Sequence, residues 1–123
     1  MNITSQIQEA IAFYKAFEPS ITAVRNAITA YYRVMGIEDF RCGVSTPTDP
    51  PGIGLDFIPE VCRERLAQLI EANGLGLRRY DGGKGTAAYF LLLKETITEQ
   101  RLQALKAAVE AEVQWQVLAG KPM

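Results

Sequence analysis

The segment that most restricts the fold is Ala87–Leu93, a run of seven alanine, aromatic and leucine residues without a charge. A strand with such a run presents apolar side chains on both faces, whereas a surface strand alternates apolar and polar residues. Crossing a bilayer takes about 20 apolar residues in a helix, so the run is too short for that. We therefore predict a strand in the middle of a sheet, with helices or a second sheet covering both of its faces.

Three further segments have the composition of strands. Leu75–Tyr80 lies directly before the glycine-rich turn Asp81–Gly85, which predicts a hairpin with the apolar run. In Phe40–Ser45 every second residue is apolar, and the same alternation returns in Ile53–Phe57. The loop Thr46–Gly52 between them contains three prolines, which cannot donate to a strand ladder. Together these segments predict an antiparallel sheet of about four strands.

In the remaining segments the apolar residues recur at helical spacing. The N-terminal part carries apolar side chains at steps of three and four on both sides of Pro19. Because proline disfavours a helical conformation at the preceding residue, we predict a helical hairpin over residues 1–36, with one helix kinked at Pro19 as the alternative. A further helix ends at Asn73–Gly74, and the last one begins at the capping sequence Thr96–Glu99 and ends near Leu118.

The length of 123 residues fits one domain. The predicted element order is α-α-β-β-α-β-β-α, which is an α+β fold with helices packed on the antiparallel sheet. It divides into the helical hairpin over residues 1–36, a ββαββα unit over residues 37–118 and a flexible tail over residues 119–123. This order, with the small size and mild acidity, is similar to that of the dimeric chaperones that guard type III secretion effectors. The β-α-β-β-α part is equally similar to a ferredoxin-type module, so the resemblance implies a topology and leaves the function to particular residues.

The chain contains no histidine, which removes many kinds of active site. Without imidazole there is no Ser–His or Cys–His nucleophile and no histidine ligand for a metal. The two cysteines, Cys42 and Cys62, lack the short spacing of a zinc site. We therefore predict a protein without catalytic residues, metal or cofactor. An enzyme that uses carboxylates, or a binder of small ligands, is the less favoured alternative.

Charge and cysteine content bear on where the chain resides. Thirteen basic residues stand against fourteen acidic ones, which gives a net charge of −1. The first ten residues have neither the basic nor the apolar region of a signal peptide. Two thiols without a pairing pattern are typical of a reducing compartment. We predict a cytoplasmic protein that does not bind membranes, and whose weak net charge favours self-association.

The last helix carries two apolar stripes on nearly opposite sides. The first consists of Leu102, Leu105, Val109, Val113 and Val117, and the second of Ala104, Ala108, Ala111, Trp115 and Leu118. A helix packed on one layer needs a single apolar side, so the second stripe predicts a protein interface with Trp115 as its anchor. The alternative is that the N-terminal helices cover this stripe within the same chain. The predicted function is a protein interaction module of inhibitor, adaptor or chaperone type that acts as a homodimer.

A second possible binding surface lies at the tip of the glycine-rich hairpin. Its residues are Arg78, Arg79, Tyr80 and Lys84. Cations beside an aromatic ring could contact a nucleic acid, which makes nucleic-acid binding the alternative function. Two observations weigh against nucleic-acid binding. Strand alternation places Arg78 and Arg79 on opposite faces, and Asp81 adds a negative charge. The glycines do not form a phosphate-binding loop, since Gly85 takes the place of the required Ser or Thr after Lys84.

Overall fold

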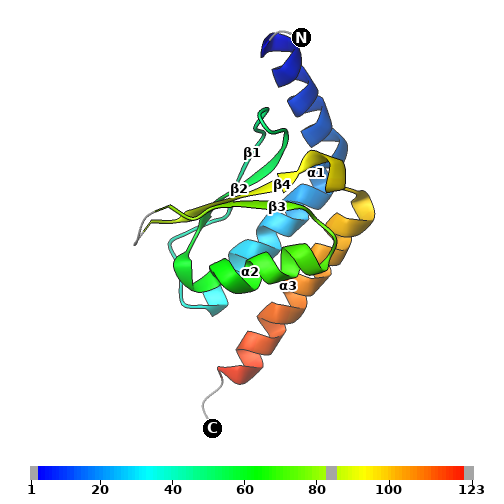
Figure 1. The fold of residues 1–123 in the computed structure, drawn as a ribbon. Helices are drawn as coiled ribbons and strands as arrows, with labels where there is room; N and C mark the ends of the chain where they lie inside the picture. Colours follow the sequence, from blue (N-terminus) through cyan, green and yellow to red (C-terminus); the bar gives the residue numbers. More distant parts are fainter. Residues whose placement is uncertain (1–2, 83–85, 121–123) are drawn as a thin grey trace.

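The structure is a computed structural model that describes residues 3–82 and 86–120. Its four strands form one antiparallel sheet in the order β1-β2-β4-β3, and its helices complete an α+β fold (Figure 1). The elements are α1 (Ile3–Val34), β1 (Gly43–Ser45), β2 (Gly52–Ile58), α2 (Glu60–Ala72), β3 (Leu77–Tyr80), β4 (Ala88–Leu93), the short 3₁₀ helix η1 (Lys94–Thr96) and α3 (Glu99–Ala119). The predicted fold class, four-stranded sheet and ββαββα unit are confirmed.

The predicted N-terminal hairpin over residues 1–36 is wrong, because α1 is one continuous helix that contains Pro19. The observed order is therefore α-β-β-α-β-β-α, with one helix fewer than expected. Pro19 is exposed, so its ring lies on the solvent side of the helix, where a bend costs least. Buried residues continue directly after it, beginning with Ser20 and Ile21. Packing of this second half holds the helix together across the proline.

The strand β4 lies between β2 and β3, which confirms the central position predicted for the apolar run. Phe90 and Leu92 point to the side of the sheet on which α2, α3 and the C-terminal half of α1 pack (Figure 1). We expected a covering layer on the other side as well, and the described residues form no such helical layer there, yet Leu91 is buried on that side too. It lies against Gly52 of β2, where a Cβ atom would come within 3.0 Å of Leu91 Cδ1. The absence of a side chain at Gly52 therefore lets Leu91 pack closely against β2.

The alternation predicted for β2 fails at Phe57. A β-bulge interrupts the pairing with β4 between Leu55 and Ile58, and Phe57 has a φ of 62°. The extra residue turns the Phe57 side chain outward, where it is 59% exposed, and Ile58 takes the buried position instead. A left-handed conformation at a bulky residue costs free energy, so the packing on either side of the bulge holds it in place.

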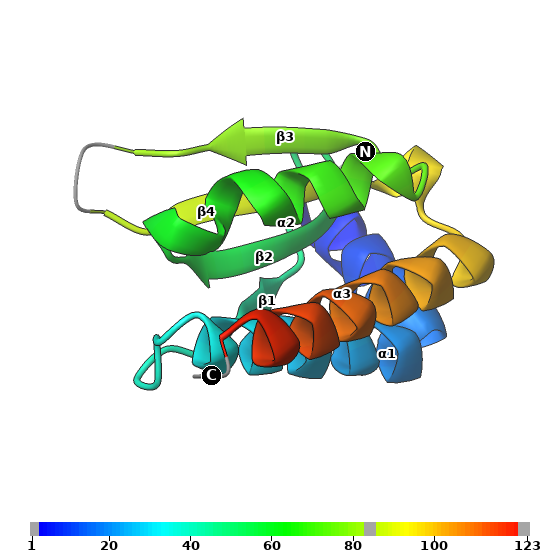
Figure 2. The same ribbon diagram turned by 90° about the horizontal axis from the view of Figure 1, so that it is seen from below.

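The helices α1 and α3 run side by side in the same direction (Figures 1 and 2). Near the start of α3, the hydroxyl of Ser20 donates to Glu99, and the amide of Gln103 donates to the Ser20 oxygen over 2.9 Å. On the other flank of α3, Arg65 of α2 donates to Glu112 over 2.9 Å. The first half of α1 and the last turn of α3 extend past the sheet at opposite ends (Figure 1).

Candidate functional site

The helix α3 begins where the capping sequence predicts. The hydroxyl of Thr98 accepts a hydrogen bond from the backbone N–H of Arg101 over 3.1 Å, and the helix continues to Ala119. Its buried side contains Leu102, Leu105 and Val109, which are three of the five residues of the first predicted stripe. The last member of that stripe, Val117, is exposed because α3 continues beyond the end of α1 (Figure 1).

The opposite side of α3 is exposed and carries no charge. We call it the outer face of α3, and it consists of Gln100, Ala104, Ala107, Ala111, Gln114, Trp115 and Leu118. Of the predicted interface residues, Ala104, Ala111, Trp115 and Leu118 belong to it, while Ala108 is half-buried at its margin. Sequence reasoning missed Gln100, Ala107 and Gln114, which the absence of charge at helical spacing could have indicated.

Trp115 and Leu118 are the largest side chains of the outer face, and they are 63% and 65% exposed. The alternative prediction, in which N-terminal helices cover the second stripe, is therefore wrong. α1 packs instead along the flank of α3 that contains Lys106 and Val113. The outer face has no covering element among the residues that the structure describes.

All five charged residues of α3 lie off the outer face and have partners. Glu99 accepts from Ser20, and Arg101 donates to the backbone carbonyl of Thr96 over 2.9 Å. Lys106 and Glu110 pair with each other over 3.5 Å, and Glu112 pairs with Arg65. Burial raises the pKa of the Glu112 carboxyl, but hydrogen bonds from Gln116 and Arg65 outweigh it, so the net pKa is lowered. The charges of α3 thus stabilise the fold and leave the outer face neutral.

A shallow groove of about 620 Å³ runs beside the outer face, between α1 and α3. Its lining is Ala23, Asn26, Ala27 and Ala30 from α1 with Lys106, Glu110, Val113 and Gln114 from α3. Val113 and Gln114 also line a hollow of about 320 Å³ that Val117 and Leu118 complete. The apolar end of α3 is therefore continuous with this groove, whose α1 side is lined mostly by alanines.

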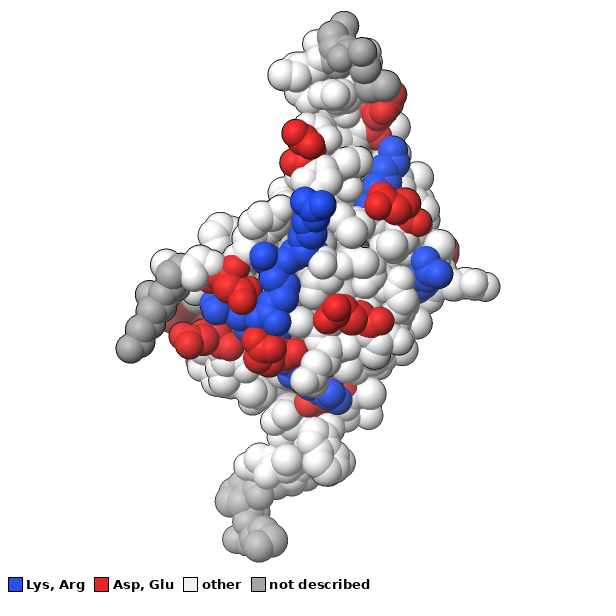
Figure 3. Space-filling view, in the orientation of Figure 1, with Lys and Arg blue, Asp and Glu red and all other residues white. Residues whose placement is uncertain are grey.

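The basic hairpin is less cationic than its sequence indicates. Arg79 donates to Glu64 over 2.7 Å and to Asp81 over 3.0 Å, and its guanidinium lies 5.4 Å from the centre of the Phe90 ring. Arg78 and Tyr80 point to the other side of β3, and Lys84 lies outside the described residues. On the face shown in Figure 3, lysine and arginine side chains alternate with acidic ones. The structure therefore does not bring the three described residues of this group, Arg78, Arg79 and Tyr80, together into one positive surface.

A polar cluster that the sequence did not reveal lies on the sheet side without helices. Ser45 donates to the Tyr89 hydroxyl over 3.4 Å, and Tyr89 packs against Tyr80 with ring centres 5.6 Å apart. Burial raises the pKa of Asp56, while a hydrogen bond from Ser45 partly counteracts it. These groups could hydrogen-bond a polar ligand, but none of the described cavities includes them.

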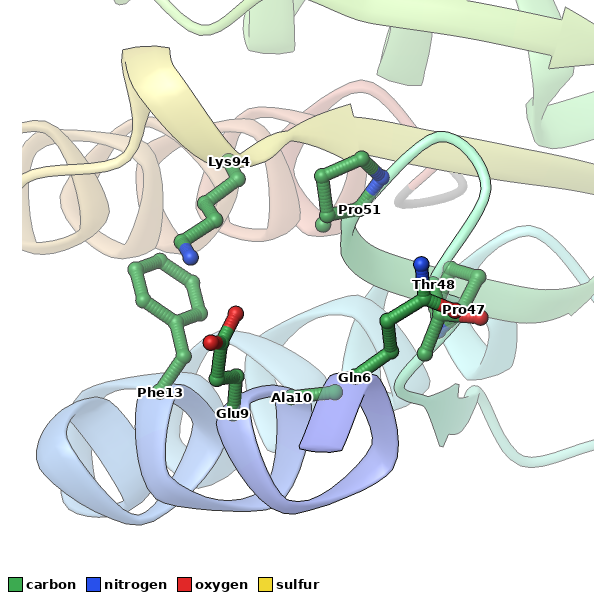
Figure 4. Close-up of a pocket in the computed structure, with 9 residues that line it drawn as sticks. Gln6, Glu9, Ala10, Phe13, Pro47, Thr48, Pro51 and Lys94 are labelled. Carbon is green, nitrogen blue, oxygen red and sulfur yellow. The ribbon is translucent and has the colours of Figure 1, made fainter. Parts of the chain in front are cut away.

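A cavity of about 180 Å³ lies between the first half of α1 and the proline-rich loop (Figure 4). Glu9 and Lys94 both border it, and the Lys94 ammonium lies 5.4 Å from the centre of the Phe13 ring. Pro47 and Pro51 close its other side. The cation–π contact with Phe13 accounts for the position of Lys94 at the edge of this cavity.

The two cysteines, Cys42 and Cys62, are buried and free. Burial raises the pKa of Cys42 to about 12 and that of Cys62 to about 11, so both are protonated at neutral pH. Within residues 3–82 and 86–120, no group of three or more potential metal ligands comes together. In the same ranges, no helix combines the length and the apolar character that crossing a membrane requires.

The outer face of α3 is thus an exposed helical surface without charge in the part of the chain that the structure describes. Its geometry suits contact with another helix, since it has small residues in the middle and large ones at one end. A comparison with known protein families, with curated proteins and with solved structures finds no match for this chain.

Proposed function

We propose that this chain is a non-enzymatic protein interaction module, of inhibitor, adaptor or chaperone type, that docks to protein through the outer face of α3. The observation that carries the proposal is the exposure of Trp115 and Leu118 on a helix face without charge. Tryptophan is among the residues that contribute most to binding free energy when a partner buries them. Alanines beside it allow the backbone of a partner helix to approach closely.

Desolvation favours the outer face of α3 over the basic hairpin as a binding surface. Burying a charge is costly unless it is paired, and the outer face has none to bury. The basic hairpin differs, because a phosphate would compete with Glu64 and Asp81 for Arg79. The observations therefore support protein docking more strongly than nucleic-acid binding.

A photo-crosslinking amino acid at position 111 tests the proposal in an extract of the native host. Ala111 is exposed in the middle of the outer face, so a docked protein would lie against the probe. We expect a discrete adduct of higher mass, whether with a second copy or with another protein. Trp115→Glu in the same chain should reduce the adduct by at least about tenfold, because it replaces the aromatic anchor of the contact with a charge.

The matched control places the same probe at Val61, which is 53% exposed on α2. This position should give no discrete adduct. The proposal is wrong if position 111 gives no adduct, or if both positions give the same products and Trp115→Glu changes neither. Circular dichroism of each variant checks that the fold is retained, which the exposure of all three positions predicts.

A further inference from the structure

We infer that the partner that fits the outer face of α3 is a second copy of this chain, bound by antiparallel pairing of the two α3 helices. The inference rests on the proposed function and names the occupant of the same surface. It concerns five side chains that we call the seam, namely Ala104, Ala108, Ala111, Trp115 and Leu118.

The spacing of the seam is that of a helix–helix contact. Its members follow one another at steps of four, three, four and three residues, which is the repeat that keeps a stripe facing a partner helix. Four of its members are exposed, and Ala108 is half-buried against the core at its margin. Arg101 continues the repeat by three residues toward the N-terminus, where its guanidinium is bound to the Thr96 carbonyl. The seam is therefore complete in spacing and lacks its partner within the chain.

The side chains of two seams are complementary in size when the two α3 helices run antiparallel. We consider two α3 helices that pair antiparallel about a two-fold axis between positions 108 and 111. Each residue of the repeat on one helix then faces a different residue of the same repeat on the other helix. The resulting pairs are Ala104 with Trp115, Ala108 with Ala111, and Arg101 with Leu118. Each large side chain thus meets a small one or an aliphatic stem, and the helices come closest at the alanines in the middle. Parallel pairing would instead place Trp115 against Trp115 and leave a gap at Ala104.

The charges of α3 agree with this arrangement. The five seam residues are neutral. The charge that continues the repeat is Arg101, whose guanidinium is bound to the Thr96 carbonyl, so only its aliphatic stem would lie against Leu118 of the second copy. Pairing of the two seams therefore leaves no unpaired charge buried.

The inference is tested by exchanging the tryptophan at position 115 with the alanine at position 104. Sedimentation equilibrium measures the dimer dissociation constant of each variant. We expect the wild type to be a dimer. Trp115→Ala removes the large side chain, and Ala104→Trp places two tryptophans against each other, so each should raise the dimer dissociation constant at least about tenfold. The double variant, Ala104→Trp with Trp115→Ala, restores one tryptophan opposite one alanine. It should return the constant to within about threefold of the wild type.

Val61→Glu on α2 is the matched control and should leave the dissociation constant unchanged, since it lies outside the seam. All substituted positions are exposed, so the folded helix remains and circular dichroism verifies it. The inference is overturned if the wild type is monomeric at its highest soluble concentration, or if the double variant is as weak as the single ones. A monomer that still gives an adduct with another protein at position 111 overturns only the self-pairing and leaves the proposed function in place.

Discussion

Replacing Gly52 by alanine is expected to lower the free energy of unfolding by about 3 kcal/mol or more. A Cβ atom at this position would collide with the backbone carbonyl oxygen of Leu92 and come within 3.0 Å of Leu91 Cδ1. Gly52 is paired with Leu93 in the contact between the two central strands of the sheet. The backbone cannot move away without loss of ladder hydrogen bonds, so the clash is relieved only by disrupting the sheet.

The control for Gly52→Ala is Gly36→Ala. It separates the free-energy cost of a steric clash from the cost of a left-handed backbone conformation. Gly36 has a φ of 90°, but a Cβ atom there would have no neighbour within 4 Å. Its replacement should cost only about 1–2 kcal/mol, the conformational penalty of a left-handed residue with a side chain. Urea denaturation of both variants measures the difference. An equal cost for the two would contradict the close approach of β2 and β4 at Gly52.

Replacing Arg65 by alanine is expected to lower the free energy of unfolding by about 2 kcal/mol at neutral pH. The variant leaves the buried Glu112 carboxylate without the guanidinium that donates to it over 2.9 Å. Leaving a fully buried charge unpaired costs about 3–5 kcal/mol, but the Arg65 side chain is 48% exposed, so solvent reduces the effect. The exposed pair of Lys106 and Glu110 gives the control, since Lys106→Ala should cost only about 0.5 kcal/mol.

The loss in Arg65→Ala should depend on pH in a defined direction. In the wild type the pKa of Glu112 is lowered from its usual 4.5, so the folded state binds this proton less readily than the unfolded state. The stability from the ion pair is therefore present above about pH 4.5 and is lost as the pH falls below it. Without Arg65 the buried carboxyl protonates at higher pH, so the deficit of the variant should shrink on acidification. Urea titrations from neutral pH to pH 3 measure this, and a deficit that does not change with pH would contradict the role of Glu112.

Patterns within single segments predicted much of the fold, because they follow from the geometry of the backbone. The run at Ala87–Leu93 indicated a central strand, and Thr98 marked the start of the last helix. Phe57 shows the limit of such patterns. Its place in an alternating strand predicted a buried side chain, but the bulge required by pairing with β4 turns it to solvent. Local periodicity does not contain the register of a neighbouring strand.

The candidate site also depends partly on a local sequence pattern and partly on contacts between distant segments. The spacing of Ala104, Trp115 and Leu118 on one side of a helix is a property of the sequence alone. Whether that side is covered depended on where α1 packs, and continuity of α1 through Pro19 was decided by the burial of its second half. The pairing of Arg79 with Glu64 likewise joins two elements that no local pattern connects.

The sequence by itself therefore determined the four strands, the last two α-helices, the α+β class and the two-sided character of the last helix. The tertiary structure alone decided which side of α3 is left to solvent, which charges are neutralised and where strand alternation breaks. The physical reason is that periodicity arises from dihedral angles of neighbouring residues, whereas coverage and ion pairing are contacts between segments distant in the chain.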